Sequence, residues 1–359
     1  MTMKDKLILY GGRKARQIVQ EEGLCPERVQ VVAGAAGGPK WLILYGLDRF
    51  LFVDFFRDRQ IPLHLVGSSI GTWRFAVVSS DEPAAALARF KTAYIHQQYG
   101  DKPSPADVSA VARDILDAVI DDAGMERVLH HPRFYLNILT VRETGPDSLR
   151  RPRPAQLAAL AGAALGNALS RKSLGLFFER VVFHHPADGQ FLAGLPDFPA
   201  RRLVLNPSNI RPAILASGSI PLVMSGVRGI PGAPPGAYRD GGIIDYHLNL
   251  PFPCDPDRLV LFPHYLDRII PGWFDKKIAW RRPNSSYLDN VLMIAPHPSF
   301  VSSLPHGKIP DRKDFVTFHN RNQERFDYWE KVVDKSRELA EELAELVSTG
   351  RIGERIRPF

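Results

Sequence analysis

The stretch GSSIG at Gly67–Gly71 decides how this chain is interpreted. The apolar run Ile61–Val66 before it predicts a short buried strand, and Thr72–Val78 after it predicts a helix. A serine between two glycines at a strand-to-helix turn is the pattern of a nucleophile elbow, which would expose Ser69. A tight turn of this kind leaves no room for Cβ atoms two positions before and after the serine. An ordinary turn explains the same residues equally well, so the rest of the chain has to decide.

The residues before the elbow predict an α/β fold. Arg28–Ala33 predicts a strand, because β-branched residues run directly into glycine. The loop GAAGGPK at Gly34–Lys40 follows, and Pro39 suits the first turn of a helix. Trp41–Phe56 is apolar on nearly every side, which predicts a buried helix. Strands alternating with helices in this way are typical of a layered α/β fold with a mainly parallel sheet and helices on both faces.

Further elements are expected along the whole chain. We expect helices at 12–23, within 80–125, and at 155–169, 211–216 and 317–347, and strands at 134–141, 176–184, 202–205, 258–262 and 290–294. No repeat or linker divides the chain, so residues 1–359 are expected to form one domain.

The glycine loop is a candidate anion site. Backbone amides of Gly37 and Gly38 at a helix N-terminus can point at a phosphate or at the oxyanion of an acyl-transfer intermediate. The P-loop pattern fails, because Gly38 precedes proline and Lys40 precedes Trp41, and the dinucleotide fingerprint G-x-G-x-x-G fails as well. A loop that only requires a tight backbone remains the alternative.

A third feature lies far downstream, at Asp240-Gly241-Gly242. It follows an extended segment and presents a carboxylate with nothing bulky beside it. Taken alone, Asp-Gly is a favoured turn pair, and a simple turn is the stronger interpretation.

Together, the glycine loop, the G-x-S-x-G elbow and the Asp-Gly-Gly motif resemble the patatin-like phospholipases in order and local context. Ala213–Pro221 looks like the helix-to-proline segment of that family, and Asn249–Pro251 looks like its continuation after Asp-Gly-Gly. The resemblance covers about residues 28–251. The C-terminal third, with its long helix at about 317–347, has no counterpart in it.

The resemblance implies a three-layer α/β/α fold and a Ser-Asp dyad, with Ser69 as nucleophile and Asp240 as general base. Gly37 and Gly38 would form the oxyanion hole. The remaining motif positions, which would support the site, are Gly67, Gly71, Lys40, Gly241 and Gly242. The implied reaction is hydrolysis of lipid acyl esters through an acyl-serine, without metal or organic cofactor.

Three positions depart from the family pattern. Ala36 stands where glycine is common, which matters little if its amide is not a donor. Trp41 and Ile70 replace smaller residues, so both are expected to narrow the site. Lys40 either holds the loop, attracts an anionic headgroup or lies on a helix surface.

Two other interpretations remain. One is an α/β-hydrolase triad, since the chain has 11 histidines, including five after Asp240: His247, His264, His297, His306 and His319. The other is a non-catalytic protein that binds lipid surfaces. Trp273–Arg282 interleaves aromatic and basic residues, as at membrane interfaces, although a solvated loop is the simpler interpretation. Ala155–Leu169 is either a lipid-facing flap or, more simply, a core helix.

Composition sets broad limits on the protein class. The 359 residues are 45% apolar and carry a net charge of +7, which suits anionic surfaces but is also compatible with simple solubility. The cysteines Cys25 and Cys254 form no disulfide framework or metal cluster. Met1–Lys6 precedes too short an apolar run for a signal peptide, and no stretch is long enough to span a membrane. We therefore expect a cytoplasmic protein with peripheral membrane contact, a lipid or acyl-ester substrate and no nucleic-acid partner.

Overall fold

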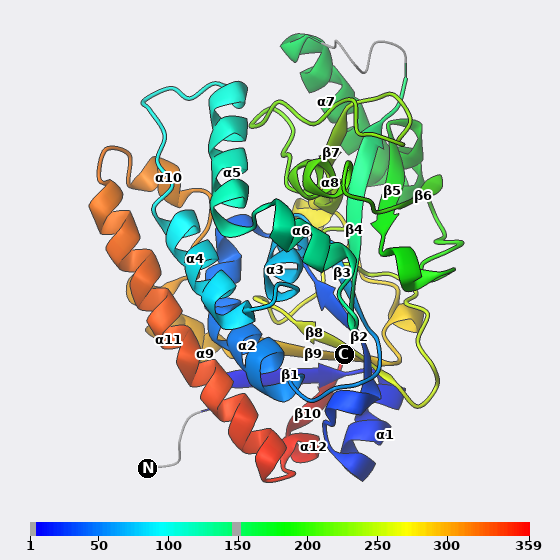
Figure 1. Cartoon of the computed structure of the whole chain (residues 1–359), viewed down its shortest axis with the longest axis vertical. Helices are drawn as coiled ribbons and strands as arrows, with labels where there is room; N and C mark the ends of the chain where they lie inside the picture. The colour runs from blue at the N-terminus through cyan, green and yellow to red at the C-terminus, as the bar shows by residue number, and fades with distance from the viewer. Residues whose placement is uncertain (1–4, 146–151) are drawn as a thin grey trace.

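A computed structural model describes residues 5–145 and 152–359 and shows a large, mostly parallel sheet flanked by helices (Figure 1). The N-terminal stretch Met1–Lys6 lies mainly outside the described residues. The strand order is β10-β1-β9-β8-β2-β3-β4-β5-β6, and β7 pairs with β4 away from this path. Antiparallel pairing is confined to β1 with β9 and to β4 with β5 and β7 among the described strands.

The strands that carry the motifs lie in the middle of the sheet. β3 (Leu63–Ser68) lies between β2 (Val29–Gly34) and β4 (Phe134–Glu143), and all three run parallel. Their side chains are almost all buried, as expected for a parallel sheet covered on both faces. Because parallel strands end at one edge, the loops after β2 and β3 meet there.

The C-terminal third belongs to the same sheet rather than to a separate unit. It contributes β8 (Leu259–Pro263), β9 (Val291–Pro296) and β10 (Ile356–Pro358), while β1 (Leu7–Gly11) pairs with β9 and β10. The other strands are β5 (Phe178–His184), β6 (Ala200–Val204) and β7 (Tyr238–Asp240). The sequence analysis did not predict β1, β7 and β10.

The helices follow the predicted positions closely. They are α1 (Arg13–Glu22), α2 (Tyr45–Arg49), α3 (Ile70–Val78), α4 (Pro83–Ile95), α5 (Pro105–Val119), α6 (Asp122–Leu129), α7 (Arg153–Leu169), α8 (Ile210–Ser217), α9 (Pro298–Ser303), α10 (Asp314–Thr317), α11 (Asn322–Ser348) and α12 (Ile352–Arg355). The segment expected as one buried helix is divided into a 3-10 turn (Gly38–Leu44), α2 and a π-helical turn (Phe50–Phe55).

The long C-terminal helix begins later than predicted. The chain turns at Asn320, whose φ of 58° is left-handed, and so separates α10 from α11. α11 then packs along α2 and α4, at the left edge of Figure 1. Its predicted apolar stripe is buried, including Phe326, Trp329 and Leu343.

The simpler interpretation of 155–169 as a core helix is wrong. Only Ala163 and Asn167 of α7 are buried, whereas Leu165 is 72% exposed and Leu169 is 91% exposed. Alanine and leucine favour a helix, but this composition does not specify whether another element covers it. In the described part of the chain, no helix has the length and apolar character needed to cross a bilayer.

Candidate active site

Ser69 sits on a strained turn between β3 and α3. Its φ of 56° and ψ of −126° place a non-glycine residue in a conformation that costs energy and is held by its surroundings. A Cβ atom on Gly71 would lie 2.0 Å from the carbonyl oxygen of Gly34, and one on Gly67 would lie 2.5 Å from the nitrogen of Thr72. The steric requirement inferred for both glycines is therefore present.

Ser217, at the end of α8, anchors this turn. The Ser69 amide donates to Ser217 Oγ at 2.9 Å, and Ser217 Oγ donates to the carbonyl oxygen of Leu139 at 2.7 Å. The elbow is thereby tied to β4. Ser217 lies inside the Ala213–Pro221 segment that contributes to the resemblance, yet nothing in the sequence assigned it this contact.

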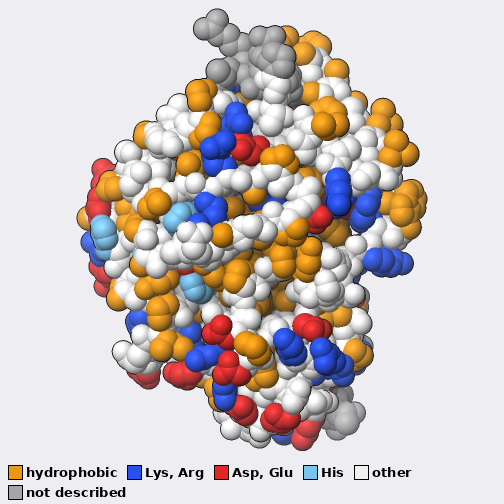
Figure 2. Space-filling model, turned by 90° about the vertical axis from the view of Figure 1, so that its right-hand side faces the viewer, with side chains coloured by type: hydrophobic (Ala, Val, Ile, Leu, Met, Phe, Trp, Pro, Cys, Tyr) orange, Lys and Arg blue, Asp and Glu red, His pale blue; other side chains and the backbone are white. Residues whose placement is uncertain are grey.

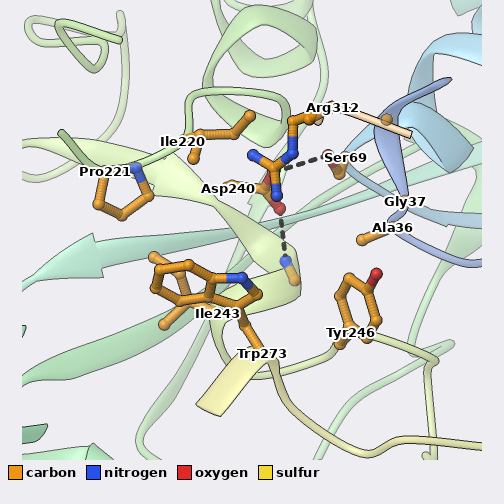
Figure 3. Close-up of a pocket in the computed structure, with 12 residues that line it drawn as sticks. Ala36, Gly37, Ser69, Ile220, Pro221, Asp240, Ile243, Tyr246, Trp273 and Arg312 are labelled. Carbon is orange, nitrogen blue, oxygen red and sulfur yellow. Dashed lines mark hydrogen bonds between the residues drawn. The ribbon is translucent and has the colours of Figure 1, made fainter. Parts of the chain in front are cut away.

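Asp240 meets Ser69 at the end of β7. Ser69 Oγ donates to Asp240 Oδ2 at 2.7 Å, and the Gly242 amide donates to Asp240 Oδ1 at 2.8 Å (Figure 3). A Cβ atom on Gly241 would lie 2.3 Å from the carbonyl oxygen of Leu139, and one on Gly242 would lie 2.7 Å from Ala36 Cβ. Both glycines therefore allow the carboxylate to approach β4 and the glycine loop, which an ordinary turn would not require.

Burial raises the pKa of Asp240 above the usual value of an aspartic acid. The hydrogen bonds from Ser69 and Gly242 and the charges of Arg312 and Lys276 oppose that shift. A carboxylate in this environment is more basic than one in water, which is what proton abstraction from a serine hydroxyl requires.

The glycine loop faces the same small cavity. The amide of Ala36 donates to the carbonyl oxygen of Tyr246 at 2.9 Å, so it is not available to an oxyanion. Among the described residues, the amides of Gly37 and Gly38 have no hydrogen-bond partner, and both residues line the cavity with Ser69. This cavity has a volume of about 20 Å³, enough for a small reacting group.

A buried Tyr-His pair supports the loop from below. Tyr265 donates its hydroxyl hydrogen to the carbonyl oxygen of Ala36, and a Cβ atom on Gly37 would lie 2.6 Å from the Tyr265 ring. His247 accepts the amide hydrogen of Ile270 at Nδ1, so its Nε2 donates to the Tyr265 hydroxyl at 2.9 Å. Burial lowers the pKa of His247 well below its usual value, which keeps the ring neutral.

The downstream histidines of the triad interpretation lie elsewhere. His264 is buried and accepts the Leu266 amide, His297 caps α9, and His306 packs against Phe318 and Tyr328. His319 lies on the surface near Asp101. Within residues 5–145 and 152–359, no histidine hydrogen-bonds to Ser69 or Asp240.

An apolar groove of about 560 Å³ opens beside Ser69. Its walls come from α5, the segments on either side of that helix and the turn after α8. They include Tyr94, Tyr99, Val108, Ala112, Ile115, Leu222 and Met224. Ile70 lines this groove, as the expectation of a narrowed site requires. Trp41 does not, because its side chain is fully buried against Phe90, so that part of the expectation is wrong.

Several pocket residues come from the C-terminal third and were not predicted. Tyr246, Trp273 and Arg312 line the cavity over Ser69 (Figure 3). Lys276 stacks on the Tyr246 ring at 3.8 Å, and Lys40 lies 5.0 Å from the centre of the Tyr265 ring. Lys40 therefore packs against the support of the glycine loop and is not a solvated helix-surface lysine. Cations near a carboxylate were the only signal in the sequence, and lysine and arginine are too common for that to be specific.

Comparison of the chain with protein-family models and with curated proteins found no match to either.

Proposed function

We propose that this protein is a serine carboxylic ester hydrolase that acts on lipid acyl esters with a Ser69–Asp240 dyad, in a fold of the patatin-like phospholipase type. The observation that carries the proposal is the 2.7 Å hydrogen bond from Ser69 Oγ to Asp240 Oδ2. It occurs on a strained elbow, beside two glycine amides without partners in the described chain. Nucleophile, base and oxyanion donors are the three parts that acyl transfer requires.

The reaction follows from these positions. Asp240 accepts the hydroxyl proton while Ser69 Oγ attacks the ester carbonyl, and the amides of Gly37 and Gly38 stabilise the tetrahedral oxyanion. Collapse of this intermediate breaks the ester bond, and Asp240 returns the proton to the departing alcohol. Water then attacks the acyl-serine with Asp240 again as base, and the carboxylic acid leaves.

The groove indicates what kind of acyl group is bound. Its walls are mostly aliphatic and aromatic, and it begins at Ser69. A chain with many methylene groups gains about 0.8 kcal/mol for each group buried in such a site. We therefore propose long fatty acyl chains as the acyl part of the substrate.

Filling the groove is expected to change chain-length preference. In the Ala112→Trp variant, an indole would occupy the wall formed by α5, and kcat/KM for a p-nitrophenyl dodecanoate should fall about 10-fold or more relative to the butyrate. Ala118→Trp, on the exposed side of α5, should keep the wild-type ratio. Hydrolysis rates across a series of p-nitrophenyl esters measure both. An unchanged ratio in Ala112→Trp would contradict the assignment of the groove, and no hydrolysis by the wild type would contradict the function.

We also propose that α7 contacts the lipid surface. Leu165 and Leu169 are one helical turn apart and exposed, and Trp280 is 71% exposed on the segment after Trp273–Lys277. The two segments are joined, since Asn167 donates to Asp275 Oδ1 at 2.8 Å. Figure 2 shows hydrophobic side chains beside Lys and Arg side chains toward the top of the molecule. Apolar and basic groups together favour a bilayer interface.

Removing the two leucines is expected to weaken membrane binding. The Leu165→Ser/Leu169→Ser variant should bind anionic phospholipid vesicles about 10-fold more weakly in a sedimentation assay, since about two exposed side chains would lose insertion. Ile61→Ser, before β3 and so at the opposite edge of the sheet, is the matched control. Equal binding by both variants would remove α7 from the contact surface.

A further inference from the structure

Arg312 is a half-buried guanidinium at the junction of the small cavity and the apolar groove. It lines both, and Figure 3 shows its side chain pointing toward Ser69 and Asp240. A Cβ atom built on Gly38 would lie 3.5 Å from Arg312 Cγ, so its stem crosses the glycine loop. In the described part of the chain, the guanidinium has no hydrogen bond and no ion pair.

The loop that carries Arg312 is fixed by a buried carboxylate. Asp314 is fully buried, and its Oδ2 accepts from the Asp311 amide at 2.9 Å and from Trp329 Nε1 at 3.0 Å. Its Oδ1 accepts from Lys308 Nζ at 2.6 Å. The guanidinium is thus presented by a rigid segment, and the entropy cost of ordering it is reduced before any ligand binds.

The nearest acidic group does not neutralise Arg312. Asp311 Oδ1 accepts from the Lys313 amide at 2.7 Å, and Asp311 Oδ2 lies 3.4 Å from Lys308 Nζ. Other cations add to the field instead. Arg312 and Lys40 both lower the pKa of Lys276, which burial holds at about 7, and Lys40 and Lys276 each feel the charge of Arg312. Against these three cations, the site offers the single carboxylate of Asp240.

We infer that Arg312 is a specificity residue that binds a phosphate group carried on the alcohol part of the substrate, next to the scissile ester. This inference rests on the proposed esterase function and names its substrate class, a fatty acyl ester of a phosphorylated alcohol. A guanidinium binds phosphate oxygens through two parallel hydrogen bonds. Its place beside Ser69 requires the phosphate to lie within a few bonds of the ester, while the acyl chain occupies the groove.

The test compares monododecanoylglycerol with its phosphate monoester. The wild type should prefer the phosphate ester, and in Arg312→Gln the ratio of the two kcat/KM values should fall about 10- to 100-fold, mainly through KM. Arg312→Lys should recover part of the ratio. Lys313→Gln removes the same charge from the exposed neighbouring residue and should leave the ratio within about 2-fold. A ratio unchanged in Arg312→Gln, or equal losses on both esters, would overturn the inference; equal losses would indicate action on the oxyanion.

A binding measurement separates this inference from the proposed function. Ether analogues of the two lipids, dodecylglycerol and its phosphate monoester, cannot be hydrolysed, so calorimetric titration reports binding alone. Tighter binding of the phosphate by wild type, lost in Arg312→Gln but kept in Lys313→Gln, supports the anion site even if no ester is hydrolysed. Equal affinity of wild type and Arg312→Gln for the ether phosphate overturns it, even if both are active esterases. An arm with inorganic phosphate alone should show binding too weak to measure, because the groove contributes nothing to it.

Discussion

Replacement of Ser69 by alanine is expected to reduce ester hydrolysis by about 10⁴-fold or more. The variant keeps Asp240 and the glycine amides but has no nucleophile, so only binding and oxyanion stabilisation remain. Release of p-nitrophenol from p-nitrophenyl dodecanoate measures the loss. Because the Ser69 amide and not its hydroxyl bonds Ser217, the turn itself should survive the substitution.

Ser68 supplies the matched control for this variant. It is fully buried at the end of β3, and its hydroxyl has no partner among the described residues. Ser68→Ala therefore removes the same atom one position away and should keep activity within about 2-fold. If both variants lost activity equally, the effect would come from the fold of the elbow and not from a missing nucleophile.

Replacement of Asp240 by asparagine is expected to lower activity about 10³-fold or more and, at the same time, to stabilise the protein. The activity falls because an amide cannot take the proton of Ser69. Stability rises because burial raises the pKa of Asp240 in the folded state above its unfolded value. An acid shifted this way costs stability at neutral pH, and the cost disappears as pH falls through the folded pKa toward the unfolded one. The melting temperature of Asp240→Asn should exceed that of the wild type by about 1–3 °C at pH 7, and the difference should shrink toward pH 4.

Asp245 provides the contrasting variant. It is buried to a similar degree, but Arg180 Nε donates to its Oδ2 at 2.7 Å and Arg180 Nη2 donates to its Oδ1 at 2.8 Å. Asp245→Asn leaves a buried guanidinium without its counter-charge and should destabilise the fold by about 3–5 kcal/mol. A loss of stability in Asp240→Asn like that in Asp245→Asn would mean that Asp240 serves the fold and not proton transfer.

The sequence predicted the parts of this fold and site that depend on local rules. Glycines flank Ser69 because backbone groups abut there, and that requirement is legible from the letters alone. The buried strands around β3 were predicted because parallel strands covered on both faces are continuously apolar. The pairing of Ser69 with Asp240 came from the order of three motifs, which no single motif indicated.

Other features depend on tertiary contacts that no local pattern encodes. The predicted core helix at 155–169 is mostly exposed, because no other element covers its leucine face. The short strands β7 and β10 exist only through pairing with β4 and β1. Arg312 reaches the pocket because Asp314 fixes a loop more than 240 residues from Ser69, and an isolated arginine carries no signal of such a contact.

Labelling with a fluorophosphonate probe tests the central claim most directly, since these reagents react with an activated serine hydroxyl and need no knowledge of the natural substrate. Mass spectrometry of the wild type should show one probe adduct on the peptide containing Ser69, with labelling lost in Ser69→Ala, strongly slowed in Asp240→Asn and retained in Ser68→Ala. Equal labelling of wild type and Ser69→Ala, or an adduct on another residue, would contradict the assignment of Ser69 as the nucleophile.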